Sequence, residues 1–258
     1  MSAASRPLTP LTLEICVGSL EHAVAAERAG ADRLELCAEL AVGGTTPGRA
    51  LMKAVRESVR LPIYAMVRPR GGDFVYSAEE FDAMKKDILE ARECGMDGIV
   101  LGVLDATGRV DAPRTKELVN LAHPLPVTFH RAFDEVRDSS AALEAVIATG
   151  ARRILTSGGK PRALDGLVAL EQLVNQARRR IAILPGSGID AGNVAQIVQA
   201  TGAREVHASL GLAGGSAGGL TGGSSGQSGS RNGVVEWQQK VQELRGALEE
   251  LTVLLLAR

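Results

Sequence analysis

The chain has 258 residues, a formal net charge of -1 and 3 cysteines. A charge so close to zero gives no electrostatic footprint for nucleic acid or for an anionic membrane surface, and no apolar run reaches the roughly 18 residues of a membrane-spanning helix. Because an odd and sparse set of cysteines argues against a disulfide scaffold, the chain is expected in the reducing cytoplasm.

Residues 1–10 contain one arginine and no apolar core, so they are not expected to be a signal peptide. After them, two kinds of short apolar run alternate. One kind follows a glycine, which ends a helix because only glycine enters the left-handed conformation at no steric cost. The other lies beside a proline, which lacks the amide donor of a helix. In chain order the eight runs are 10–15, 30–36, 62–67, 95–101, 126–129, 150–155, 181–184 and 202–206. Their Val, Ile and Leu content predicts strands covered on both faces.

Segments with helical spacing lie between these runs. Ser19 caps one of them, and Ser77 opens another with the capping box Ser-Ala-Glu-Glu. The predicted helices cover 19–29, 77–94, 139–149 and 164–178, and a further helix starts near Asp190. Eight strand–helix units in about 250 residues predict an α/β fold, a (β/α)8 TIM barrel that fills residues 1–258 as a single domain. A doubly wound open sheet is the alternative, in which the count of eight would be accidental.

Residues 211–233 break the pattern, because glycine and serine dominate them and apolar periodicity is lost. Such a segment cannot bury enough surface to offset its ordering entropy. It is either a flexible loop or a lid over a ligand, since loops after barrel strands carry function. A last helix is predicted over 235–256, packed on the barrel or on a partner chain through apolar positions at helical spacing. These positions are Val241, Leu244, Leu248, Leu251 and Leu255.

Alternate side chains of barrel strands point into the interior. Glu14 and Cys16 share one parity of the first strand, and Glu35 and Cys37 share one parity of the second, with apolar residues at the other parity. These four side chains are therefore expected inside the barrel or at its C-terminal mouth. Further polar residues at strand ends are Arg68, Thr128, His130, Glu205 and His207. Because buried charge is costly unless paired, the two glutamates are expected to pair with Arg68 or Arg70.

Two cysteines occupy equivalent places on the neighbouring first and second strands, which are about 4.8 Å apart. Facing thiolates at Cys16 and Cys37 form a soft, two-coordinate site that selects Cu(I) over hard cations. The alternative is packing, since cysteine is often buried as a small hydrophobe. Cys94 precedes a helix-ending glycine and is assigned to packing.

Two loops that follow strands carry charged groups. These are Arg68, Arg70 and Asp73 after the third strand, and His130, Arg131 and Asp134 after the fifth. The first loop suits the gripping of an anionic group, or else a structural ion-pair network with the strand glutamates. In the second, His130 can act as general acid or base with Asp134 orienting it.

Two glycine-containing stretches end the sixth and seventh strands and form a candidate anion site. They contain Thr156, Ser157 and Gly158, and Gly186, Ser187 and Gly188. Glycines beside a helix N-terminus can cradle a phosphate, and many barrels hold phosphate after strands seven and eight. Tight turns are the alternative interpretation of both stretches.

Several of these stretches together resemble the CutC family of copper homeostasis proteins. They are Leu34–Cys37, Gly43–Pro47, Arg68–Phe74 with Tyr76–Ser77, Thr128–Asp134 and Leu155–Gly158. The resemblance covers residues 11–210, in order. It implies a cytoplasmic (β/α)8 barrel that forms a homodimer or homotetramer and takes part in copper handling. It also implies that Cys16 and Cys37 are the Cu(I) ligands. Ala208 stands where relatives can carry a cysteine, so a third thiolate is absent.

Three functions follow as hypotheses. The first is a Cu(I)-binding barrel. The second is an enzyme of unassigned activity on a small anionic molecule, phosphorylated or carboxylated, in which the arginines bind the anion. Its candidate catalytic residues are Glu14, Glu35, Arg68, Arg70, Asp73, His130, Arg131, Asp134 and His207. In this hypothesis His130 moves a proton, and Glu35 is a second acid–base group. The third is a non-catalytic scaffold that acts through its oligomer surface.

Overall fold

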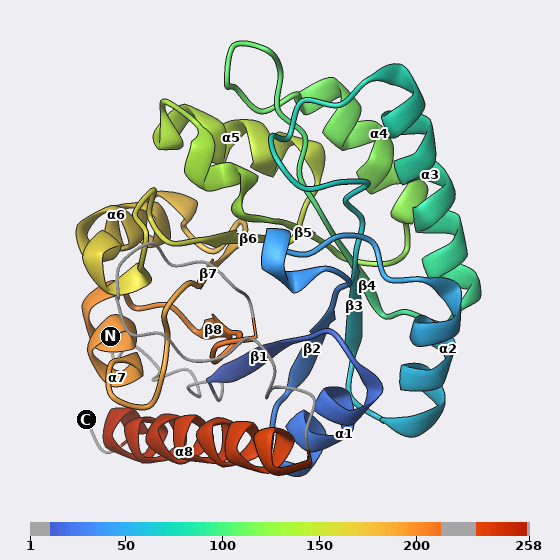
Figure 1. The fold of residues 1–258 in the computed structure, drawn as a ribbon. Coiled ribbons are helices and arrows are strands. Elements are labelled where there is room, and N and C mark those ends of the chain that lie inside the picture. The colour runs from blue at the N-terminus through green and yellow to red at the C-terminus, as the bar shows by residue number, and fades with distance from the viewer. Residues whose placement is uncertain (1–10, 213–230, 257–258) are drawn as a thin grey trace, which may run out of the picture.

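A computed structural model of the chain describes residues 11–212 and 231–256. Eight parallel strands form one sheet in the order β7-β6-β5-β4-β3-β2-β1-β8, and its two end strands lie side by side and close it into a barrel. Helices surround this barrel, as Figure 1 shows. The predicted (β/α)8 TIM barrel is therefore confirmed.

The strands and helices alternate along the chain. The strands are β1 Thr12–Val17, β2 Arg33–Leu36, β3 Ile63–Met66, β4 Gly98–Leu101, β5 Val127–Phe129, β6 Arg153–Thr156, β7 Ala182–Pro185 and β8 Glu205–Ala208. The helices are α1 Leu20–Arg28, α2 Arg49–Ser58, α3 Ala78–Glu93, α4 Ala112–Ala122, α5 Ser139–Thr149, α6 Leu167–Ala177, α7 Val194–Thr201 and α8 Arg231–Leu256. Short 3-10 helices cover Leu40–Val42, Arg131–Glu135 and Ala163–Gly166.

The helix starts follow the local sequence signals, with two corrections. Ser19 accepts a hydrogen bond from the backbone N–H of His22, and Ser77 forms the full capping box with Glu80. The helix predicted from residue 164 begins at Leu167, because a 3-10 helix precedes it. The helix predicted near Asp190 begins at Val194, since residues 190–193 form a turn.

The two parities of each strand face different surroundings, as expected. Leu13 and Ile15 of β1 are fully buried in the large apolar core that includes the inner faces of the helices. Cys16 belongs to a separate, smaller cluster inside the barrel. Its other buried members are Cys37, Tyr64, Met66 and Val100. The interior of the barrel is thus where the sulfur atoms and the polar strand residues meet.

Helix α8 packs against α1 and α7 (Figure 1), so it covers the barrel. The predicted stripe is buried, apart from the partly buried Leu255, and Trp237 adds to it. The helix begins at residue 231, before the predicted start at 235, and residues 213–230 of the predicted Gly/Ser-rich segment lie outside the described residues. None of the helices within 11–212 and 231–256 combines the length and apolarity that crossing a bilayer requires.

Candidate functional site

A cavity of about 860 Å³ opens at the C-terminal ends of the barrel strands. Residues from seven of the eight strand ends or the loops after them line it. The predicted site residues that line it are Cys16, Glu35, Arg68, His130, Arg131, Ser187, Gly188 and His207. The structure thus brings these eight predicted residues, which include possible metal ligands and possible anion-binding groups, together at one cavity. Lys240 and Glu243 of α8 also line the cavity. We did not predict these two residues as part of the site. They are polar positions of the predicted C-terminal helix, for which only the apolar positions were assigned a role.

Other predicted site residues lie away from this cavity. Arg70 forms ion pairs with Glu80 at 2.6 Å and with Asp73 at 2.9 Å, on the surface at the start of α3. These pairs fold the loop back on the helix cap. Because Arg70 pairs with two carboxylates of the chain itself, the arrangement of this loop does not support the prediction that it binds an external anion.

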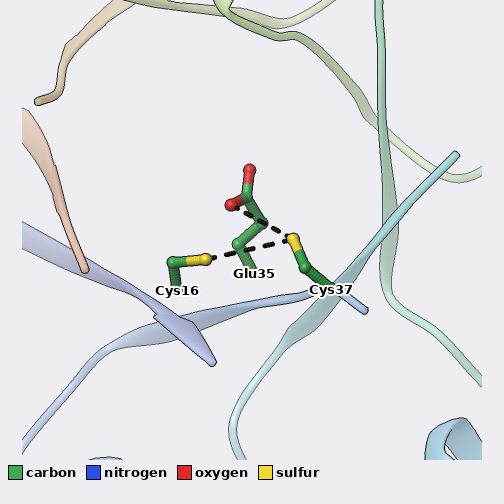
Figure 2. A group of neighbouring side chains, drawn as sticks. All are labelled: Cys16, Glu35 and Cys37. Atoms are coloured by element: carbon green, nitrogen blue, oxygen red, sulfur yellow. Dashed lines mark hydrogen bonds between the residues drawn. The ribbon is translucent and has the colours of Figure 1, made fainter. Parts of the chain in front are cut away.

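The two thiols lie close together inside the barrel, with the carboxylate of Glu35 beside them (Figure 2). The Sγ atoms of Cys16 and Cys37 are 3.9 Å apart, and Cys37 Sγ donates to Glu35 Oε2 at 3.5 Å. We expected the two cysteines to occupy equivalent places on their strands, but they do not. The strand register pairs Cys16 with Glu35, so Cys37 lies two residues further along β2.

Both thiols are buried and hold their protons at neutral pH. The hydrogen bond between Cys16 and Cys37 lowers the pKa of Cys16, but burial and the carboxylate of Glu35 outweigh it and raise this pKa to about 11. The same hydrogen bond and burial raise the pKa of Cys37 well above its ordinary value. Burial also raises the pKa of the Glu35 carboxyl, against the opposing attraction of His207.

The loop after β2 passes directly over Cys37, which explains one glycine of the Gly-Gly-Thr-Thr motif. Gly44 has a φ of +86°, and a Cβ there would lie 3.0 Å from Cys37 Sγ. A larger residue would therefore be strained in its backbone and would press on the thiol. Arg68 Nη1 donates to the carbonyls of Val42 and Gly44, at 2.9 and 3.1 Å, and so holds this loop in place.

Glu14 is fully buried beneath the cavity, and its partners differ from those we predicted. Arg33 of β2 donates through Nε to Glu14 and through Nη2 to Glu205, and His207 Nδ1 lies 2.8 Å from the other oxygen of Glu14. Burial raises the pKa of Glu14, but the charges of Arg33 and His207 outweigh it and hold this pKa at about 2. The expected pairing of the strand glutamates with Arg68 or Arg70 is therefore wrong.

Arg33 is a further residue of the site region that we did not predict. It has the same strand parity as Glu35 and Cys37, so the alternation rule could have identified it. Arg153 of β6 completes the network, since its Nε donates to Glu205 at 2.6 Å. The interior charges are thus balanced by strand arginines rather than by loop arginines.

Arg68 is buried, with 5% of its surface exposed, and lines the cavity. Its guanidinium donates to three backbone carbonyls, of Val42, Gly44 and Gly72, and lies 4.8 Å from the centre of the Phe74 ring. Within the described residues no carboxylate forms an ion pair with it. Because a buried charge normally has a counter-charge, the cavity next to Arg68 favours an anionic occupant.

His130 lines the cavity as a neutral ring. Its Nδ1 accepts the backbone N–H of Ala132 at 3.2 Å, so the proton of the neutral ring lies on Nε2. Burial and the charge of Arg68 lower its pKa to about 3. The ring fits because residue 102 is glycine: a Cβ there would lie 2.5 Å from His130 Nδ1. This neutral tautomer is suited to donating a hydrogen bond.

Asp134 does not orient His130, so that part of the prediction is wrong. Its carboxylate instead accepts hydrogen bonds from Thr156 Oγ1, from the backbone N–H groups of Ser157 and Gly159, and from Arg131 Nε. The donors of the first glycine-containing stretch are therefore used by a carboxylate of the chain itself. Of the predicted anion-site residues, only Ser187 and Gly188 line the cavity.

Comparisons with known proteins agree with the motifs. The CutC family matches residues 11–212. A human protein named copper homeostasis protein cutC homolog is 48% identical over 197 residues, which are 76% of this chain and 72% of the relative. A CutC family protein of Chromobacterium violaceum is 49% identical over 197 residues, covering 76% and 80%. The crystal structure of a CutC protein from Streptococcus agalactiae superimposes with a TM-score of 0.73 at 34% identity, covering 77% of this chain and 98% of that one.

Proposed function

The chain belongs to the CutC family of copper homeostasis proteins, and from this premise we propose that it binds one Cu(I) ion between Cys16 and Cys37, at the C-terminal mouth of the barrel. Copper is the cargo in this proposal. The protein acts in the cytoplasm, where thiols stay reduced, as a homodimer or homotetramer and without nucleic acid or a membrane as partner.

The separation of the two sulfur atoms carries the proposal. At 3.9 Å it is too long for a disulfide, in which the sulfurs are about 2.05 Å apart. It is shorter than two metal–thiolate bonds of about 2.3 Å each, so both sulfurs can reach one ion. Two thiolates are soft ligands, which Cu(I) prefers over oxygen donors.

The surroundings of the thiols also suit this ion. Tyr64, Met66 and Val100 enclose the pair in a small apolar cluster, and Cys16 lines the cavity through which an ion can enter. An apolar shell limits access of water to a bound ion. Cys37 is 1% exposed and does not itself line the cavity.

Binding of Cu(I) is expected to strengthen with pH. Because the pKa of Cys16 is raised to about 11 and that of Cys37 is raised as well, both thiols are protonated between pH 6 and 8 and must lose their protons to bind the ion. Each released proton contributes about a tenfold gain in affinity per pH unit, so two give about 100-fold.

Anaerobic competition with a chromogenic Cu(I) chelator at pH 6, 7 and 8 measures this dependence, after correction for the protonation of the chelator itself. The proposal requires a stoichiometry of one Cu(I) per chain. A stoichiometry of zero, or an affinity that is independent of pH, would contradict it.

We propose a second candidate function, in which the cavity binds a small anionic molecule as the substrate of an enzyme. The observation that favours it is Arg68, which is buried beside the cavity and whose guanidinium donates to backbone carbonyls and to no carboxylate among the described residues. The neutral His130 on the same wall supplies a further donor. A phosphorylated or carboxylated molecule would neutralise the guanidinium.

A thermal-shift screen of phosphorylated and carboxylated metabolites tests this second function. A true ligand at 100 times its dissociation constant contributes about 2.7 kcal/mol, which is a rise of roughly 5–10 °C in Tm for a chain of this size. The variant Arg68→Gln is expected to lose the rise. Arg109→Gln, at an exposed position away from the cavity, is the matched control. A rise that persists in Arg68→Gln would exclude the proposed role of this arginine.

A further inference from the structure

Glu35 adds an oxygen donor to the thiol pair. The ligand atoms of Cys16, Glu35 and Cys37 all lie within 4.8 Å of one another, and all three residues are buried. Figure 2 shows the carboxylate to one side of the two sulfurs, and its Oε2 atom accepts the hydrogen bond of 3.5 Å from Cys37 Sγ. Three negatively ionisable groups therefore converge on one small volume beside the cavity.

The sheet itself produces this convergence. The register of β1 and β2 pairs Cys16 with Glu35 across the two strands. Cys37 directly follows β2 and lies two residues beyond Glu35, so the two side chains point to the same face. The three donors are thus held by the backbone of adjacent parallel strands, which is a more rigid support than a loop.

The cluster is incomplete as it stands. Glu35 Oε1 is buried and has no hydrogen-bond partner among the described groups. The nearest cationic group to the carboxylate is His207, whose Nε2 lies 3.8 Å from Oε2. Within the described residues neither Arg33 nor Arg68 bonds to Glu35: Arg33 bonds to Glu14 and Glu205, and the Arg68 guanidinium bonds to backbone carbonyls. A buried oxygen without a donor is costly, and a bound cation would satisfy it.

We propose that Cys16, Glu35 and Cys37 form a three-donor site for a divalent thiophilic cation, of which Zn²⁺ fits best. This inference rests on the same thiol pair as the proposed Cu(I) site. Sulfur and carboxylate oxygen are both zinc ligands, and sites with three protein ligands keep a fourth position open for water or substrate. The cavity that Cys16 and Glu35 line supplies that open position.

Charge explains why Glu35 discriminates between Cu(I) and a divalent ion. Two thiolates carry two negative charges, which Cu(I) half neutralises without needing an oxygen donor. A divalent ion neutralises both thiolates and can accept a further carboxylate at little cost in net charge. The ring of His207 lies beside the carboxylate and is itself held by Glu14, so it can orient Glu35 from behind. Glu35 is therefore the residue that determines which cation the thiol pair accepts.

Titration of the reduced protein with Co²⁺, a spectroscopic substitute for Zn²⁺, tests the inference. The native chain is expected to bind one Co²⁺ with thiolate-to-cobalt charge-transfer absorption, and Zn²⁺ is expected to displace it. Glu35→Gln is expected to weaken Co²⁺ and Zn²⁺ binding by at least about tenfold, while it still binds one Cu(I) per chain through the two sulfurs. Glu135→Gln makes the same change at an exposed carboxylate on the cavity rim and is expected to leave Co²⁺ binding unaltered.

The possible results separate this inference from the proposed copper function. If Glu35→Gln binds Co²⁺ with the native affinity and spectrum, Glu35 is not a ligand and the inference is overturned. If the native chain binds Cu(I) but no Co²⁺, the inference fails and the copper function stands. If it binds neither, both fail. Glu35→Asp, which keeps the charge but withdraws the carboxylate, provides the same comparison if Glu35→Gln does not fold.

Discussion

Replacing Cys16 and Cys37 together by serine is expected to abolish Cu(I) binding. Each serine keeps the size of the side chain but exchanges a soft sulfur for a hard hydroxyl oxygen, which Cu(I) disfavours. Loss of an outer-shell partner alone typically weakens a metal site by about 10–100-fold, so loss of both ligands should exceed 100-fold. The affinity is measured by competition with a chromogenic chelator under anaerobic conditions.

Cys94→Ser is the matched control for this experiment. Cys94 is the remaining cysteine of the chain, is also buried, and belongs to the large apolar core rather than to the barrel interior. Its replacement is expected to lower stability without changing Cu(I) affinity or stoichiometry. The single variants Cys16→Ser and Cys37→Ser should each lose most of the affinity, because two-coordinate binding needs both sulfurs. An unchanged affinity in the double variant, with native circular dichroism and melting, would end the copper proposal.

Arg33→Ala is expected to lower the free energy of unfolding by about 3–5 kcal/mol, the usual cost of removing one partner from a buried ion pair. Arg33 lies between Glu14 and Glu205 in the barrel, and its side chain is 6% exposed. Its removal leaves Glu14, which is fully buried, with His207 as its remaining cationic partner. Denaturant unfolding followed by circular dichroism measures the change.

Arg49→Ala is a close control, because Arg49 also bridges two glutamates, Glu90 and Glu93, but lies on the surface. Solvent screens exposed pairs, so this variant is expected to stay close to the native stability. Equal losses in the two arginine variants would contradict the role assigned to the interior pair.

Acid unfolding gives a further measurement on the same pair. The pKa of Glu14 is held at about 2, below its ordinary value of 4.5, so its ionised form contributes stability above about pH 4.5 that is lost as the pH falls toward 2. Without Arg33 the pKa of Glu14 rises, and the variant should lose less of its remaining stability over this pH range. A native-like acid dependence in Arg33→Ala would show that Glu14 is not stabilised by this arginine.

The fold was predictable because its signals are local. A glycine or proline beside each short apolar run marks a strand, and the eight repeats of this unit define the barrel. Strand parity correctly separated Leu13 and Ile15 from Cys16, since alternation depends only on the pleat of the strand.

The pairings within the site were not predictable in the same way, because they depend on the stagger between neighbouring strands. The register that pairs Cys16 with Glu35 is a property of the closed barrel. A shift of two residues would pair it with Cys37 instead. Loop residues were harder still: Asp134 bonds Ser157 rather than His130, and no periodicity in the sequence determines which donors a loop carboxylate finds.

The unequal positions of the two sulfurs have a kinetic consequence. Cys16 lines the cavity, whereas Cys37 does not and lies under the backbone of Gly44. An arriving ion would meet the sulfur of Cys16 first, and this sulfur would replace one ligand of the molecule that carries the ion. Only then would the ion reach the sulfur of Cys37. Handover would therefore proceed in two steps through a singly attached intermediate, and it would favour carriers small enough to enter the mouth over proteins that dock on its rim.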